Sequence, residues 1–144
     1  MNRGVVFIDA NVLVYFLDET AVQHEEVVNY LQRLVDNQAQ MYTSHHVIEE
    51  VLFVVSRLSE GKDAIATAIQ EIIAIPNLDL IEPAADFGFA ERYVKLYRSS
   101  KVGINDTLLL QLMIDGGITK LFSYDEKFLK QAALAGILPV VKSE

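Results

Sequence analysis

The stretch that decides the fold is Val5-Val6-Phe7-Ile8-Asp9, in which four apolar residues lead directly into an acid. A short, uninterrupted apolar run of this kind is typical of a strand buried on both faces of a parallel sheet. A second run, over residues 121–124, ends directly before Asp125. Carboxylates rarely adjoin such segments without a partner, so both acids call for a structural or functional explanation.

Strand-like and helix-like patterns alternate along the rest of the chain. Strands are expected over residues 5–8, 40–43, 78–81, 120–123 and 138–141. Helices are expected over residues 11–17, 22–35, 45–58, 64–75, 83–98, 105–114 and 126–134. Ser44 is a favourable N-cap, Pro76 ends one helix, and the glycines after residue 115 stop another. This alternation predicts an α/β fold with a parallel sheet covered on both faces.

The composition limits the class of protein. The chain has 144 residues, which suits a single domain spanning residues 1–144. It has no cysteine, which excludes disulfides and thiolate zinc sites and fits a reducing, cytoplasmic location. No signal peptide or membrane-spanning run is recognisable. A net charge of -8 argues against general nucleic-acid binding, so any such contact needs local positive charge or bound metal.

Four acids stand out as candidate site residues: Asp9, Glu50, Asp106 and Asp125. Two of them follow predicted strands, and ligands of parallel sheets bind beyond the carboxyl ends of the strands. Each of the three aspartates also lies near a predicted helix start. Helix capping alone is therefore an alternative explanation for any one of them.

Glu50 is not explained by capping. It shares a helix face with Val47 and Val54, and is therefore expected to point inward, where a charge needs a partner. The adjacent Glu49 lies on the face of His46 and remains an alternative ligand if the phase of the helix differs.

Together the four acids favour a metal site. Clustered carboxylates repel one another unless a cation is present, and ligand sets made only of oxygen suit Mg²⁺ or Mn²⁺. Such a site is able to activate water and to stabilise the charge of a phosphodiester.

With these four acids, the chain resembles the PIN-domain ribonucleases and is similar to VapC-type toxins. The resemblance rests on four motifs that span nearly the whole chain: residues 7–13 (FIDANVL), Ser44 with residues 50–52 (EVL), Asn105-Asp106, and residues 123–128 (SYDEKF). The acids of these motifs are separated by 41, 56 and 19 residues.

The resemblance implies a three-layer α/β/α sandwich with a central parallel sheet and a metal-dependent endoribonuclease activity. It assigns both catalysis and metal binding to the four acids and supporting roles to Asn11 and Ser123. It also implies a small antitoxin partner, whose tail enters the acidic groove, and a homodimer. The alternative is a non-catalytic PIN-like module that binds RNA or protein, although such a module would be expected to lose some of the acids.

A basic stretch is the candidate for RNA binding. Arg92, Lys95 and Arg98 fall within one arc of a predicted helix, and Lys101 follows in the next loop. They are expected to hold RNA phosphates, with a solvated helix face as the alternative. The pair His45-His46 lacks further zinc ligands nearby and is expected at a helix start, with His46 one turn before Glu50.

Overall fold

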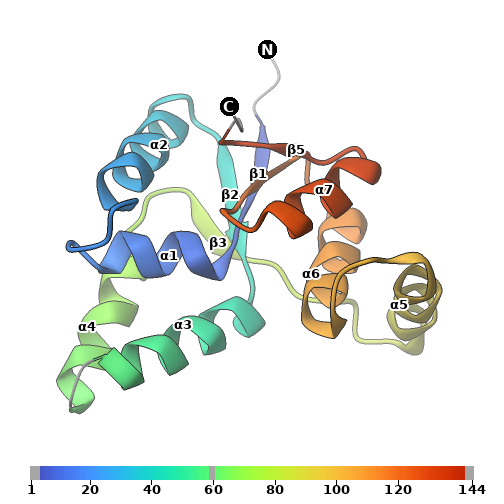
Figure 1. Cartoon of the computed structure of the whole chain (residues 1–144), viewed down its shortest axis with the longest axis horizontal. Coiled ribbons are helices and arrows are strands. Elements are labelled where there is room, and N and C mark those ends of the chain that lie inside the picture. The colour runs from blue at the N-terminus through green and yellow to red at the C-terminus, as the bar shows by residue number, and fades with distance from the viewer. Residues whose placement is uncertain (1–3, 59–60, 142–144) are drawn as a thin grey trace.

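Five parallel strands form a single sheet at the centre of the molecule (Figure 1). The computed structural model describes residues 4–58 and 61–141. The strand order is β3-β2-β1-β4-β5. The strands are β1 (Val5–Ile8), β2 (Gln40–Thr43), β3 (Leu78–Leu80), β4 (Lys120–Phe122) and β5 (Leu138–Pro139). Every neighbouring pair is parallel, as the alternation of strands and helices predicts.

The central strand is β1, which pairs with β2 on one side and with β4 on the other. Val6, Phe7 and Ile8 are fully buried. A strand with a neighbour on each side and a helix layer on each face has almost no contact with water, which explains its uninterrupted apolar run. Because the strands are parallel, their carboxyl ends lie along one edge of the sheet, and Asp9 follows β1 at this edge.

Seven helices cover the two faces of this sheet in the described part of the chain. Figure 1 shows α1 to α4 on one side of the strands and α6 and α7 on the other, with α5 packed outside α6. Their bounds are α1 Ala10–Leu17, α2 His24–Asp36, α3 His45–Leu58, α4 Lys62–Ile73, α5 Phe87–Ser99, α6 Ile104–Asp115 and α7 Glu126–Leu134. The three-layer α/β/α sandwich expected from the sequence is confirmed.

Several element ends differ from the sequence-based prediction. The fifth helix begins at Phe87, four residues after Pro83, because the side chain of Asp86 caps it by accepting a hydrogen bond from the Gly88 amide at 2.9 Å. The last strand is shorter than predicted and ends at Pro139, although the Val140 amide still donates to the Leu121 carbonyl at 3.0 Å. The bounds of β1, β2, α3 and α7 agree with the prediction.

One hydrophobic core joins the sheet to both helix layers. Its largest fully buried side chains include Phe7 of β1, Phe122 of β4 and Phe128 of α7. Within residues 4–58 and 61–141, no helix combines the length and the apolar character needed to cross a membrane.

Candidate active site

Asp9 is the buried centre of the acidic site, with only 6% of its surface exposed. Its backbone amide continues the sheet by donating to the carbonyl of Phe122 at 3.0 Å. Its side chain is the N-cap of α1, where Oδ1 accepts from the Ala10 amide at 2.8 Å. The other oxygen, Oδ2, accepts from the Ser123 hydroxyl at 2.7 Å. Both oxygens are therefore fixed by the local structure.

A polar network joins the end of β1 to the end of β4. The Ser123 hydroxyl donates to Asp9 and accepts from the Asp125 amide at 3.1 Å. The Asn11 amide group donates to Ser123 Oγ at 3.3 Å and lies 3.5 Å from Asp9 Oδ2. Asn11 Oδ1 in turn accepts from the Tyr124 amide at 3.1 Å. Asn11 and Ser123 thus join two segments that are far apart in the chain, and their supporting roles stay predictions.

Asp125 and Glu50 lie at the exposed rim of the site. Asp125 is the N-cap of α7, and its Oδ1 accepts from the Phe128 amide at 3.2 Å. Glu50 projects from α3 and is exposed, whereas Val47 on the same helix face is fully buried. The inward orientation expected for Glu50 is therefore wrong: an ionised carboxylate is costly to bury, and the site is open to solvent on this side.

Asp106 lies in the first turn of α6 and is only half-buried. The N-cap of this helix is Gly103, and Asp106 makes no capping hydrogen bond within the described residues. Burial raises the pKa of its carboxyl to about 6, with further contributions from the negative charges of Asp9 and Asp125 and an opposing contribution from His46. Capping therefore explains Asp9 and Asp125 in part but does not explain Asp106.

Electrostatic interactions connect all four acids. Burial is the main cause that raises the pKa of Asp9, and the charges of Glu50 and Asp125 raise it further. Hydrogen bonds from Ser123 and from the Ala10 amide lower the pKa of Asp9 again. Glu49 is not among the charges that act on Asp9, whereas Glu50 is. The charges of Glu50 and Asp125 thus act on Asp9, and those of Asp9 and Asp125 act on Asp106, which relates the four acids electrostatically.

The donor chemistry of this site fits a hard divalent cation. Its four acids supply only oxygen atoms, and the two with raised pKa, Asp9 and Asp106, have their ionised forms disfavoured without a counter-charge. The side chains as they stand leave no group of three or more His, Asp or Glu within metal-holding distance, among the residues described.

The histidine pair is divided between two environments. His45 is exposed and forms an ion pair with Glu82, whose carboxylate also accepts from the His45 backbone amide at 3.1 Å. The Nε2 atom of His46 is buried without a hydrogen-bond partner among the described residues. Because the charge of His46 acts on Asp106, this unpaired ring nitrogen belongs to the surroundings of the acidic site.

In the predicted RNA-binding patch on α5, one of the three basic residues is already paired with an acid. The Arg92 guanidinium forms a bidentate ion pair with Asp115 of α6, with its shortest contact at 2.9 Å. Lys95 and Arg98 are exposed on the same helix. Lys127 and Lys130 of α7, which the sequence analysis did not single out, are exposed as well.

Comparisons with known proteins agree on one family. Residues 6–134 match the PIN domain. The chain is 31% identical over 132 residues to "Ribonuclease VapC1" of Aquifex aeolicus, covering 89% of this chain and 86% of that protein. Among solved structures it is similar to VapBC2 from Rickettsia felis, bound to a promoter DNA fragment, with a TM-score of 0.70 at 19% identity, covering 94% and 96% of the two chains. It is also similar to Mycobacterium tuberculosis VapC20, a toxin that cleaves the sarcin-ricin loop, with a TM-score of 0.64 at 17% identity, covering 92% and 96%.

Proposed function

This chain belongs to the PIN domain family, and we propose that it is a metal-dependent endoribonuclease that hydrolyses RNA phosphodiester bonds. The observation that supports the proposal is the electrostatic coupling among these acids: Glu50 and Asp125 raise the pKa of Asp9, and Asp9 and Asp125 raise the pKa of Asp106. The similarity to a protein named as a ribonuclease supports the choice of RNA as the substrate.

The four acids would hold Mg²⁺ or Mn²⁺. When bound, the cation supplies Lewis-acid chemistry, neutralising charge on the phosphodiester and making water a better nucleophile. Asp9 is the fixed point of the site, because Ser123 and Asn11 hold its carboxylate in one orientation. Glu50 and Asp125 approach from the rim, and Asp106 from the first turn of α6 completes the set.

The rival function is a non-catalytic PIN-like module that binds RNA or protein. A binding module does not need four carboxylates at one point, and their mutual repulsion lowers the stability of such a module without a compensating role. The retention of all four acids therefore favours the enzyme.

The test is cleavage of a mixed RNA pool by the wild-type chain and by Asp9→Asn, with Mg²⁺ or Mn²⁺ and with EDTA. We expect cleavage only by the wild-type chain with metal. Folded wild-type protein that cleaves no RNA under any of these conditions would leave the binding-module function in its place.

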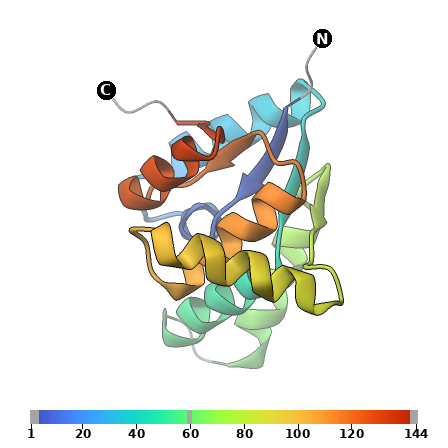
Figure 2. The same cartoon turned by 90° about the vertical axis from the view of Figure 1, so that its right-hand side faces the viewer.

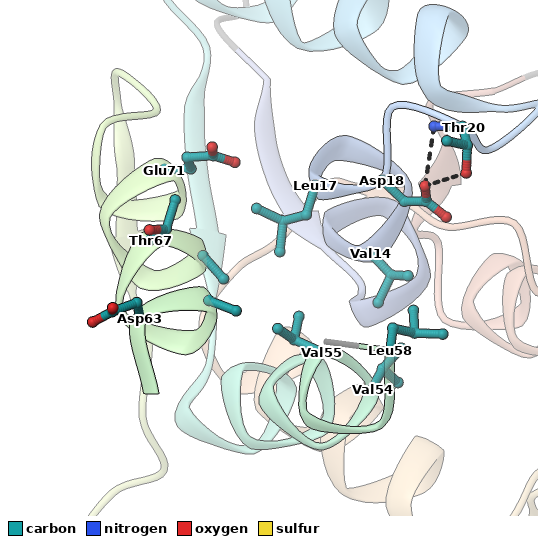
Figure 3. A pocket seen from close by; sticks show the side chains of 12 residues that line it. Val14, Leu17, Asp18, Thr20, Val54, Val55, Leu58, Asp63, Thr67 and Glu71 are labelled. Carbon is teal, nitrogen blue, oxygen red and sulfur yellow. Dashed lines mark hydrogen bonds between the residues drawn. The ribbon is translucent and has the colours of Figure 1, made fainter. Parts of the chain in front are cut away.

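A small protein partner of the antitoxin type is part of this proposal, because the similar Rickettsia felis structure is a VapBC2 complex. A second surface suits such a partner: an open cavity of about 600 Å³ between α1, α3 and α4 (Figure 3). Leu17 of α1 and Val55 of α3 point into it, as Figure 3 shows. The described lining includes the acids Asp18, Asp63 and Glu71 and no basic residue.

This apolar floor with an acidic border would accept an amphipathic helix that carries basic residues along its edge. We expect a partner helix of that kind to bind there, while a separate basic tail enters the acidic site. The homodimer and the cytoplasmic location expected from the sequence stay predictions.

A further inference from the structure

A second cavity, of about 450 Å³, lies beside α7 and has a different chemical character. It opens between α7 and the segment that joins α5 to α6, and its lining runs along α7 from Lys127 to Leu134. Among the described residues, six line it, of which three are lysines and none is acidic: Lys101, Val102, Lys127, Lys130, Gln131 and Leu134. In a chain of 12 basic and 20 acidic residues, this concentration of positive charge needs an explanation.

The walls of this lysine pocket are held in place by hydrogen bonds. The backbone amide of Lys101 donates to Oε1 of the buried Gln131 at 3.1 Å, which ties the α5–α6 segment to α7. The Val102 amide donates to the Ser100 hydroxyl at 3.1 Å. Figure 2 faces this side of the molecule and shows the segment passing close to α7. The backbone on both sides of the pocket is therefore held in place by hydrogen bonds.

The three ammonium groups have no counter-charge within the described part of the chain. Neither of the ion pairs in residues 4–58 and 61–141 involves Lys101, Lys127 or Lys130. All three side chains are exposed, and Lys127 and Lys130 are three residues apart on one helix, so they lie on the same side of it. Unpaired cations at such close spacing favour the binding of a polyanion.

Both walls of the lysine pocket belong to segments that also carry acids of the site. Lys127 follows the N-cap Asp125 by two residues, and Lys101 precedes Asp106 by five. An RNA strand that runs from the acids along α7 would bring further phosphates toward the lysines. The α5 surface is a poorer candidate, because Arg92 is already paired with Asp115.

We propose that Lys101, Lys127 and Lys130 bind backbone phosphates of single-stranded RNA that flank the phosphodiester held at the acidic site. This proposal rests on the proposed ribonuclease function. The three lysines supply the local positive charge that an acidic protein needs in order to bind RNA.

The experiment compares two matched double variants, Lys127→Gln/Lys130→Gln in the pocket and Lys95→Gln/Arg98→Gln on α5. The fluorescence anisotropy of a labelled single-stranded RNA is measured in EDTA, from 25 to 200 mM KCl, with the full chain. We expect the pocket variant to bind at least about tenfold more weakly at low salt. We also expect its slope of log Kd against log salt concentration to fall by about 1.4, for two lost phosphate contacts.

The α5 variant is expected to bind within about twofold of the wild type, since it retains the pocket. Thermal unfolding checks that all chains are equally folded. An equal loss of affinity in both double variants, an unchanged affinity in the pocket variant, or no RNA binding by the wild type at 25 mM KCl each overturns the proposal. Binding of polyglutamate as tightly as RNA also overturns it and assigns the pocket to an acidic protein.

Cleavage of the same RNA with Mg²⁺, measured separately, distinguishes the two proposals. RNA binding that depends on the pocket without any cleavage keeps the lysine pocket and rejects the ribonuclease. Metal-dependent cleavage with a pocket variant of wild-type affinity keeps the ribonuclease and rejects the pocket.

Discussion

Asp106 is the acid whose ionisation most directly opposes folding without metal. Its folded pKa of about 6 lies above the ordinary aspartate value of 3.8, so the folded state binds the proton more tightly than the unfolded state does. The contribution of Asp106 to the stability of the metal-free protein should therefore fall as the pH rises from about 4 to about 6. Above this pH range, the ionised carboxylate of Asp106 lowers the free energy of unfolding by a constant amount.

The substitution Asp106→Asn removes that cost. We expect it to raise the free energy of unfolding at pH 7 by about 1 kcal/mol in EDTA, after allowance for the partial exposure of the side chain. The difference from the wild type should shrink as the pH falls toward 4. Urea unfolding between pH 4 and 7.5 measures it, with Asp63→Asn on α4 as an exposed control. A difference from the wild type that does not change with pH would contradict the electrostatic explanation.

The Ser123 hydroxyl has the opposite effect, because it stabilises the ionised form of Asp9. Replacing it in Ser123→Ala leaves a buried carboxylate oxygen without its hydroxyl donor and frees the amide of Asp125. We expect a loss of about 1–3 kcal/mol at pH 7, measured by urea unfolding. Ser123→Thr retains the hydroxyl and should recover most of the loss; if the threonine variant is as unstable as the alanine variant, packing is responsible instead.

At the scale of the element, helix α3 sets which glutamate faces the site. Adjacent residues on a helix point about 100° apart, so Glu49 and Glu50 cannot face the same site equally. We expect Glu50→Gln to weaken Mn²⁺ binding at least about tenfold and Glu49→Gln to change it by less than about twofold. Isothermal titration calorimetry with Mn²⁺ measures both variants, and the reverse order would transfer the ligand role to Glu49.

The elements also show where sequence reasoning succeeds and where it stops. Strand β1 was predictable because a doubly covered strand imposes an apolar run, and the position of Asp9 at its carboxyl end followed directly. The orientation of Glu50 was not predictable. A helix pattern shows which residues share a face, but it does not show whether that face packs against the core or lies in open solvent. The pairing of Arg92 with Asp115 was also missed, since these two residues lie 23 positions apart in the sequence and on different helices.

The lysine pocket was missed for a related reason. Lys101 lies 26 residues before Lys127 in the sequence, and only the hydrogen bond to Gln131 shows that the two segments adjoin. Local patterns predict elements, whereas surfaces made by two elements depend on how these elements pack together.

At the scale of the whole molecule, the acidic site opposes folding until a cation is bound. Mn²⁺ at about one hundred times its dissociation constant should stabilise the folded chain by about 2.7 kcal/mol. For a chain of 144 residues this corresponds to a rise in Tm of about 5–10 °C relative to EDTA. Thermal unfolding of the wild type and of the Asp9→Asn/Asp106→Asn double variant measures it. The double variant should show little rise, and an equal rise in both chains would place the ion elsewhere.

The hydrogen bond between Asp9 and Ser123 joins residues 114 positions apart. During synthesis on a ribosome, the strand that carries Asp9 emerges early, and β4 emerges only after most of the chain has been made. A nascent chain that ends before Lys120 lacks both β4, one of the two neighbours of β1, and the Ser123 hydroxyl that orients Asp9. For the ribonuclease proposed above, this order means that the surroundings of Asp9 would be completed only near the end of translation, which would protect the messenger RNA and the ribosome from a partly made enzyme.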